Sequence, residues 1–166
     1  MFGMRWRLFS LLGIPIFVDA SWLIILALLT LSLANDFPAL LQEFFPESSQ
    51  TLPPYAYWIM GLVTAVAFFV CIVLHELGHA VVARSQGIPM YGITLFMFGG
   101  VAELREEPPS AASEFLMAVA GPIVSIVLAI ACGLLAGVAY VAGLPHPIVI
   151  VLGYLVSFPV HKFRVS

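Results

Sequence analysis

The composition of this chain is that of a protein that lies in a membrane. It has 166 residues, of which 62% are hydrophobic and 9% are charged, and its formal net charge is −3. A soluble domain carries about 25% charged residues, so an ordinary soluble domain is excluded, and the acidic balance gives no sign of a nucleic-acid partner. We therefore expect an integral membrane protein, with residues 1–166 forming a single membrane-embedded core.

A first membrane span is expected after a short N-terminal segment. Between Asp19 and Asp36 lie 16 residues without a charge, close to the roughly 17–25 residues of a spanning helix. We predict this span at about residues 18–35. The preceding residues 8–18 contain a glycine and a proline, and we expect an extended interfacial segment there instead of helix. Residues 35–54 are acidic and rich in proline, and are predicted to form a loop.

The second span is expected to lead into a segment that is not helical. No charged residue occurs from Ser48 to Leu74, and we predict a span at about 55–86 that starts with an aromatic belt. Residues 88–104 are apolar but rich in glycine and in residues that favour strands. Irregular backbone at membrane depth is tolerated where it is buried by protein or lines a wet cavity. We therefore predict a re-entrant hairpin or short strand at about 88–104.

Two further spans fit into the C-terminal part of the chain. The 47 residues from Phe115 to His161 carry no formal charge, and the sequence GLPHP divides them. We predict spans at about 114–142 and 147–161, the second of which is short. The expected fold is thus all-α and integral to the membrane, with about four transmembrane helices and a small re-entrant β element.

The basic residues predict how these spans are oriented. With four spans, every Lys and Arg falls at an end that lies on one side of the membrane, whereas the opposite loops at 35–54 and 143–147 contain none. The positive-inside rule places the basic side in the cytoplasm. We therefore expect a multi-pass protein of the cell membrane with both termini in the cytoplasm.

A motif with metal-binding chemistry lies inside the second predicted span. Residues 75–79 read HELGH, which is the pattern H-E-x-x-H. Positions i and i+4 lie on one face of a helix, so both imidazoles can reach one metal ion. Glu76 is rotated by about 100° from His75 and can take a proton from water that zinc activates. The motif predicts two zinc ligands, His75 and His79, and a general base, Glu76.

The location of the HELGH motif inside a predicted membrane span favours a functional metal site over a chance occurrence of the pattern. An ionisable residue inside a membrane span costs about 2.5–3.5 kcal/mol on insertion scales. Three ionisable residues within five positions raise the free energy of membrane insertion further, unless binding of a metal ion offsets that cost. The same pattern in a soluble protein would be weaker support for a metal site.

Four segments occur in an order and spacing that are typical of a known family. They are GIPIFVDASWLI (13–24), VLHELGHAVVARSQGI (73–88), ITLFMFGGVAEL (93–104) and EFLMAVAGPIVS (114–125). With them the chain resembles the site-2 protease family of intramembrane zinc metalloproteases, peptidase family M50, near its sporulation-factor-protease branch. The combination of HELGH, FGG and AGP makes the resemblance specific over about residues 10–125.

The resemblance implies a membrane protease that cuts a transmembrane protein substrate near the cytoplasmic face of the bilayer. It implies that His75 and His79 bind zinc and that Glu76 is the base. Gly99 and Gly100 would lie in a membrane-embedded strand that binds the substrate beside the active site, because an exposed strand edge can pair with an unwound helix; the alternative is a tight turn. Gly121-Pro122 would mark a close approach of the third span, or else a helix kink.

The third zinc ligand of the family is missing from the sequence. Catalytic zinc takes three protein ligands, and the family supplies the third from an aspartate in a Leu-Asp-Gly motif at the end of the fourth span. After VLGY (151–154) this chain reads LVSFPVHKFRVS, which we interpret as a truncation or a replaced tail. His161 lies near the expected place and is a possible ligand, or else a juxtamembrane residue. The other acidic and histidine residues are expected to serve elsewhere: Asp19, Asp36, Glu103, Glu114 and His146.

The missing ligand leaves several functions open. The first is an active zinc metalloendopeptidase. The alternative is an inactive, truncated pseudoprotease that binds transmembrane helices without cleaving them. A truncated product without function and a small ion carrier are further alternatives. The sequence does not indicate the substrate, the oligomeric state or a regulator.

Overall fold

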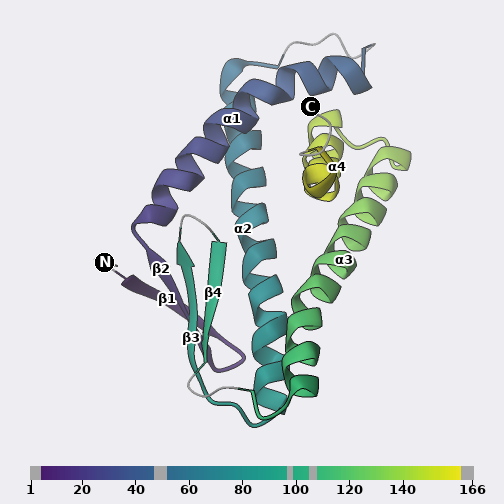
Figure 1. Cartoon of the computed structure of the whole chain (residues 1–166). Coiled ribbons are helices and arrows are strands. Elements are labelled where there is room, and N and C mark those ends of the chain that lie inside the picture. Colours follow the sequence, from purple (N-terminus) through teal and green to yellow (C-terminus); the bar gives the residue numbers. More distant parts are fainter. Residues whose placement is uncertain (1–4, 47–51, 97–98, 105–107, 162–166) are drawn as a thin grey trace. The chain divides into compact units, whose positions relative to one another are not determined.

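The fold combines long helices with one small sheet. The computed structural model describes residues 5–46, 52–96, 99–104 and 108–161, and Figure 1 labels the elements within them. The helices are α1 (Ser21–Phe44), α2 (Pro54–Ser85), α3 (Ala111–Val141) and α4 (His146–His161). The strands are β1 (Arg5–Leu11), β2 (Ile14–Asp19), β3 (Met90–Phe96) and β4 (Gly99–Leu104).

Within the described residues, three helices are long and apolar enough to cross a membrane: α1, α2 and α3. The observed bounds of α2, α3 and α4 agree closely with the predicted spans 55–86, 114–142 and 147–161. With 16 residues, α4 is shorter than the other helices. The expectation of a mostly helical chain with several helices able to cross a membrane is thereby confirmed.

The first helix is longer than predicted. We expected a loop from residue 35, but α1 continues through Asp36 and Pro38 to Phe44. The reason is tertiary packing, since Phe37 is fully buried in a cluster with Leu33 and Met60. Burial of such a side chain contributes about 1.5–3 kcal/mol, comparable with the roughly 3 kcal/mol that a proline costs inside a helix.

The sheet has the strand order β1-β2-β3-β4. Antiparallel hairpins are formed by β1 with β2 and by β3 with β4, and β2 joins them by pairing in parallel with β3. The first hairpin turns at Leu12 and Gly13, whose φ angles of 51° and 79° are typical of a tight two-residue turn. Strands thus occupy most of residues 8–18 and 88–104, where we predicted an extended interfacial segment and a re-entrant hairpin or short strand. The full extent of β1 and the parallel pairing were not expected.

The chain forms two compact units by its contacts: residues 1–25 with 69–126, and residues 26–68 with 127–166. In the first unit, β2 and β3 pack against the C-terminal part of α2. Alternate side chains of a strand point to one face, and those of β2 and β3 meet α2 in a core made of Ile14, Ile16, Val18, Val73, Leu77, Ala80, Ile93 and Leu95. This core fixes the HELGH turn of α2 beneath the sheet.

The extension of α1 can be tested by truncating Phe37. Replacement Phe37→Ala removes a fully buried ring, and we expect it to lower the free energy of unfolding by about 3–5 kcal/mol. The matched control is Phe44→Ala, because Phe44 lies on the same helix and is 62% exposed. Denaturant titration in detergent measures both variants; equal stabilities would contradict the packing described for Phe37.

Candidate metal centre

The two histidines of the motif lie together on α2. Their Nε2 atoms are 3.1 Å apart, and their rings are nearly perpendicular, with an interplanar angle of 75°. This follows from their i, i+4 spacing, which places them on successive turns of one helix face. The structure therefore brings the two predicted ligands together.

Each imidazole is held from α3 through its other nitrogen. The Nδ1 atom of His79 is 2.6 Å from the carbonyl oxygen of Met117, and the Nδ1 atom of His75 is 2.7 Å from Oγ of Ser125. A carbonyl only accepts hydrogen bonds, so His79 carries its proton on Nδ1 and keeps a lone pair on Nε2. This arrangement, with one nitrogen bonded and the other left for a ligand, is typical of metal-binding histidines.

Glycine at position 121 leaves room beside the Nε2 atoms. A Cβ there would lie 2.6 Å from Nε2 of His75 and closer still to Nε2 of His79. A Cβ at Gly78, on the facing helix, would lie 2.8 Å from Cγ2 of Val124 and 3.1 Å from the carbonyl oxygen of Ala120. The close approach predicted for Gly121 is confirmed, and only residues without a side chain fit at these contacts.

The glutamate of the motif faces the sheet instead of α3. A Cβ at Gly100 would lie 2.5 Å from Cγ of Glu76, so β4 passes directly beside that side chain. Gly99 has a φ of +132°, and among the described residues other than its chain neighbours no atom lies within 4 Å of the place of its Cβ. Gly100, rather than Gly99, is therefore the residue that touches the site.

The pair of Nε2 atoms fits a zinc ion. Zinc bonds to imidazole nitrogen at about 2.0–2.1 Å in tetrahedral geometry, which puts two nitrogen ligands about 3.3 Å apart. The observed 3.1 Å between His75 and His79 is close to that separation. A side chain at Gly121 would collide with both Nε2 atoms, and the spacing of the two imidazoles suits two of the three protein ligands of a catalytic zinc ion.

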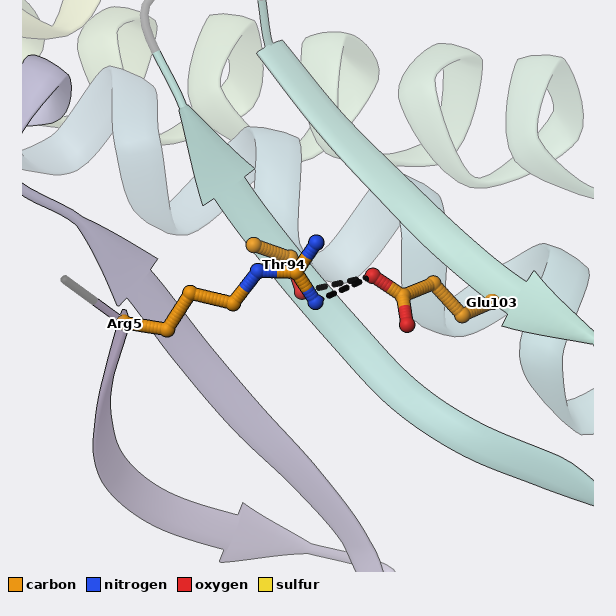
Figure 2. Close-up of polar contacts among 3 residues, drawn as sticks. All are labelled: Arg5, Thr94 and Glu103. Atoms are coloured by element: carbon orange, nitrogen blue, oxygen red, sulfur yellow. Dashed lines mark hydrogen bonds and ion pairs between the residues drawn. The ribbon is translucent and has the colours of Figure 1, made fainter. Parts of the chain in front are cut away.

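No third ligand joins them within the described part of the chain, where no group of three His, Cys, Asp or Glu residues could hold a metal. Glu103 instead binds Arg5, whose Nη1 lies 2.7 Å from its Oε1, and Thr94 donates to the same oxygen (Figure 2). His146 stacks on Phe45 with ring centroids 4.1 Å apart. Glu114 is exposed in the first turn of α3, and the side chain of His161 lies outside the described residues.

Asp19 has a structural role at the start of α1. Its Oδ1 accepts a hydrogen bond at 2.9 Å from the backbone N–H of Ser21, the first residue of α1, and so satisfies one of the N–H groups that have no partner within a helix. The hydrogen bonds from Ser21 hold the pKa of the Asp19 carboxyl below its ordinary value. Asp19 therefore stabilises the helix start while ionised, and this contribution is lost as the pH falls below about 4.

Comparison with known proteins gives the class to which this chain belongs. The model of peptidase family M50 matches residues 63–161. A putative zinc metalloprotease, sll0528 from Synechocystis, is 47% identical over 122 residues, which are 74% of this chain and 30% of that protein. The putative zinc metalloprotease Rip3 of Mycobacterium tuberculosis is 35% identical over 139 residues, which are 84% of this chain and 33% of that protein. The chain belongs to peptidase family M50, and it spans about a third of the length of these relatives.

One solved structure resembles the whole fold. The site-2 protease from Methanocaldococcus jannaschii has a TM-score of 0.55 and 24% identity, and the match covers 93% of this chain and 63% of that one. At this level of identity the likeness concerns the fold alone. It supports the arrangement of a small sheet beside membrane helices.

Of the residues predicted from the sequence, His75 and His79 lie together, Gly100 lies beside Glu76 and Gly121 lies beside the imidazoles, whereas Gly99 contacts none of them. Sequence reasoning missed Met117 and Ser125, which hold the imidazoles. The sequence feature that could have indicated them is their spacing. Residues 117, 121 and 125 are four positions apart and therefore lie on one face of a helix. Nothing in the sequence says which neighbour that face meets.

Substitution Gly121→Ala tests the space beside the imidazoles. The added methyl group collides with both Nε2 atoms, so we expect zinc bound per purified chain to fall at least tenfold. The matched control is Gly137→Ala on the same helix, where no atom lies within 4 Å of the new Cβ. Metal analysis by mass spectrometry measures both; full zinc content in Gly121→Ala would refute the assignment of this space.

Two substitutions at Asp19 separate a capping role from a ligand role. Asn retains the capping acceptor whereas Ala does not, so we expect Asp19→Ala to lower the thermal unfolding temperature more than Asp19→Asn. We expect both variants to keep the zinc content of the parent chain. Loss of zinc from a folded Asp19→Asn chain would instead make this carboxylate a ligand.

Proposed function

We propose that this chain is the metal-binding core of an intramembrane zinc metalloprotease of the site-2 type. It hydrolyses a peptide bond in or near a transmembrane segment of a membrane-protein substrate. The observation that carries the proposal is the pair of Nε2 atoms 3.1 Å apart, with both Nδ1 atoms held by α3. The names of the relatives favour a protease over a helix-binding protein that does not cleave.

The roles of the residues follow from their positions. His75 and His79 would hold Zn²⁺ through Nε2, and the bound ion would supply a Lewis acid for the scissile carbonyl and for the attacking water. Glu76 takes a proton from the attacking water and delivers it to the leaving amine. Its place beside Gly100, at the edge of the sheet, lets it act on a chain bound along β4.

The substrate is proposed to bind by adding a strand. Among the described strands β4 pairs with β3 alone, and it forms one edge of the sheet. An unwound segment of a transmembrane helix satisfies its backbone hydrogen bonds on such an edge, as it must at membrane depth. Gly99 and Gly100 keep that edge free of side chains next to Glu76.

The membrane arrangement is part of the same proposal. α4 is taken as a fourth span; its 16 residues give about 24 Å, compared with about 30 Å of hydrocarbon. The sheet is taken as re-entrant, because its hairpins flank the HELGH turn. With both termini in the cytoplasm, as the basic residues favour, residues 1–166 act as one membrane-embedded core.

Substitution Glu76→Gln tests the proposed reaction. It removes the base and keeps the shape of the side chain, so we expect unchanged zinc content and a fall in cleavage of about 10²–10⁴-fold. Epitope-tagged single-span membrane proteins, reconstituted with the purified full chain in liposomes, report cleavage by gel shift. The matched control is Glu114→Gln, at an exposed carboxylate, and we expect it to cleave normally.

Two outcomes would contradict the proposal. One is zinc content that is the same in the parent chain and in a His75→Ala, His79→Ala double variant. The other is cleavage by Glu76→Gln at the parental rate. A His161→Ala variant analysed in parallel reports whether that residue contributes the third ligand.

A further inference from the structure

A glutamate lies on the outer face of the sheet, on the strand where the substrate is proposed to bind. Ala102 of β4 packs against the core between the sheet and α2. Successive side chains of a strand point to opposite faces, so Glu103 points away from α2. Its side chain is 35% exposed, and β4 forms an edge of the sheet. A strand added to β4 would therefore run beside Glu103.

One oxygen of this carboxylate is bound from within the sheet. Arg5 of β1 reaches across the outer face and places its Nη1 atom 2.7 Å from Oε1 of Glu103, and Thr94 of β3 donates to the same oxygen at 3.3 Å (Figure 2). The other oxygen, Oε2, has no hydrogen-bond partner among the described residues. An ionised carboxylate accepts hydrogen bonds at both oxygens, so Oε2 is an acceptor that a substrate can use.

The charges around Glu103 favour a cation as the partner of that oxygen. Asp19 of β2 stands opposite Arg5 in the register of the first hairpin, so Arg5 has two carboxylates beside it and one negative charge is in excess. The next basic residue of β1, Arg7, donates instead to Ser10 on its own strand. The outer face at Glu103 is thus suited to a basic side chain and unsuited to an acidic one.

The same carboxylate is the feature of β4 that can select a register. Main-chain pairing alone specifies register weakly where a strand is rich in glycine, and a slip by one residue turns every side chain to the other face. Gly99 and Gly100 offer no side chain, and Glu103 is the only charged residue of β4. Glu103 lies three residues beyond Gly100, or about 10 Å along the strand, so a contact with it fixes which substrate residue lies beside Glu76.

We propose that Glu103 is a specificity-determining residue that pairs with a Lys or Arg side chain of the substrate strand, three positions from the substrate residue opposite Gly100. Opposite charges on directly paired strands stabilise the pairing. Basic residues flank transmembrane segments on the cytoplasmic side, so this contact holds the cytoplasmic end of the substrate segment. The inference rests on the proposed function, because it assumes that β4 binds the substrate.

The first test varies the substrate. A tagged single-span membrane protein is reconstituted in liposomes with the purified full chain, mass spectrometry of the products locates the cleaved bond, and Lys, Met or Glu is placed at successive positions on either side of it. At one position we expect kcat/KM to be about fivefold higher for Lys than for Met and about tenfold higher than for Glu. Moving that Lys by two positions keeps the other side chains on their faces, and we expect the cleaved bond to move by two residues with it.

The second test exchanges the charges of the ion pair. The double substitution Arg5→Glu, Glu103→Arg keeps an ion pair across the sheet and the net charge of the chain, but it reverses the sign at β4. We expect this variant to prefer Glu over Lys by about tenfold. The matched control is Arg7→Glu, Glu114→Arg, which exchanges the same charges at exposed residues without contact to Glu103, and we expect it to keep the parental preference.

A single substitution covers the case in which the charge exchange prevents folding. Glu103→Gln retains an oxygen that accepts from Arg5 and removes the negative charge, so we expect it to cleave without a preference for Lys. A role of Glu103 in sheet stability alone would leave the preference among substrates as it is in the parent chain.

The outcomes separate this inference from the function on which it rests. Equal cleavage of the Lys, Met and Glu substrates by an active parent chain overturns the role of Glu103 and leaves the proposed protease intact. A parental preference for Lys in Glu103→Gln, or in a folded Arg5→Glu, Glu103→Arg chain, also overturns it. A parent chain that cleaves none of the substrates overturns the proposed function and this inference together.

Discussion

The close contact between α2 and α3 is the constraint on which the site depends. Helices in lipid gain little from hydrophobic burial against each other, so their association relies on small residues that let the backbones approach. Here Gly78 meets Ala120 and Val124, and Gly121 meets the imidazoles. This close approach also brings the carbonyl of Met117 and the hydroxyl of Ser125 within hydrogen-bond distance of the histidines.

The HELGH turn of α2 contacts two neighbouring elements, α3 and β4. Its histidines face α3, whereas Glu76, rotated by about 100°, faces β4 at Gly100. The core beneath β2 and β3 holds that turn through Val73 and Leu77. The two imidazoles and the carboxylate therefore lie on different surfaces of the same helical turn.

Several polar groups of the first unit have specific hydrogen-bond partners. Both Nδ1 atoms of the histidine pair are bonded, and Glu103 is paired with Arg5 across the sheet (Figure 2). Unpaired polar groups are costly where water is scarce. In the histidine pair, α3 thereby engages both Nδ1 atoms, and the two Nε2 atoms face each other at 3.1 Å.

The sequence by itself determined the membrane class, the bounds of α2, α3 and α4, and the pairing of His75 with His79, because charge spacing and helical periodicity are local properties. Tertiary structure decided the rest. The extension of α1 past Pro38 depends on burial of Phe37, and the parallel pairing of β2 with β3 joins strands more than 70 residues apart. Ser125 and Met117 hold histidines 50 and 38 positions away, and no local pattern specifies such contacts, since they depend on which helix faces meet.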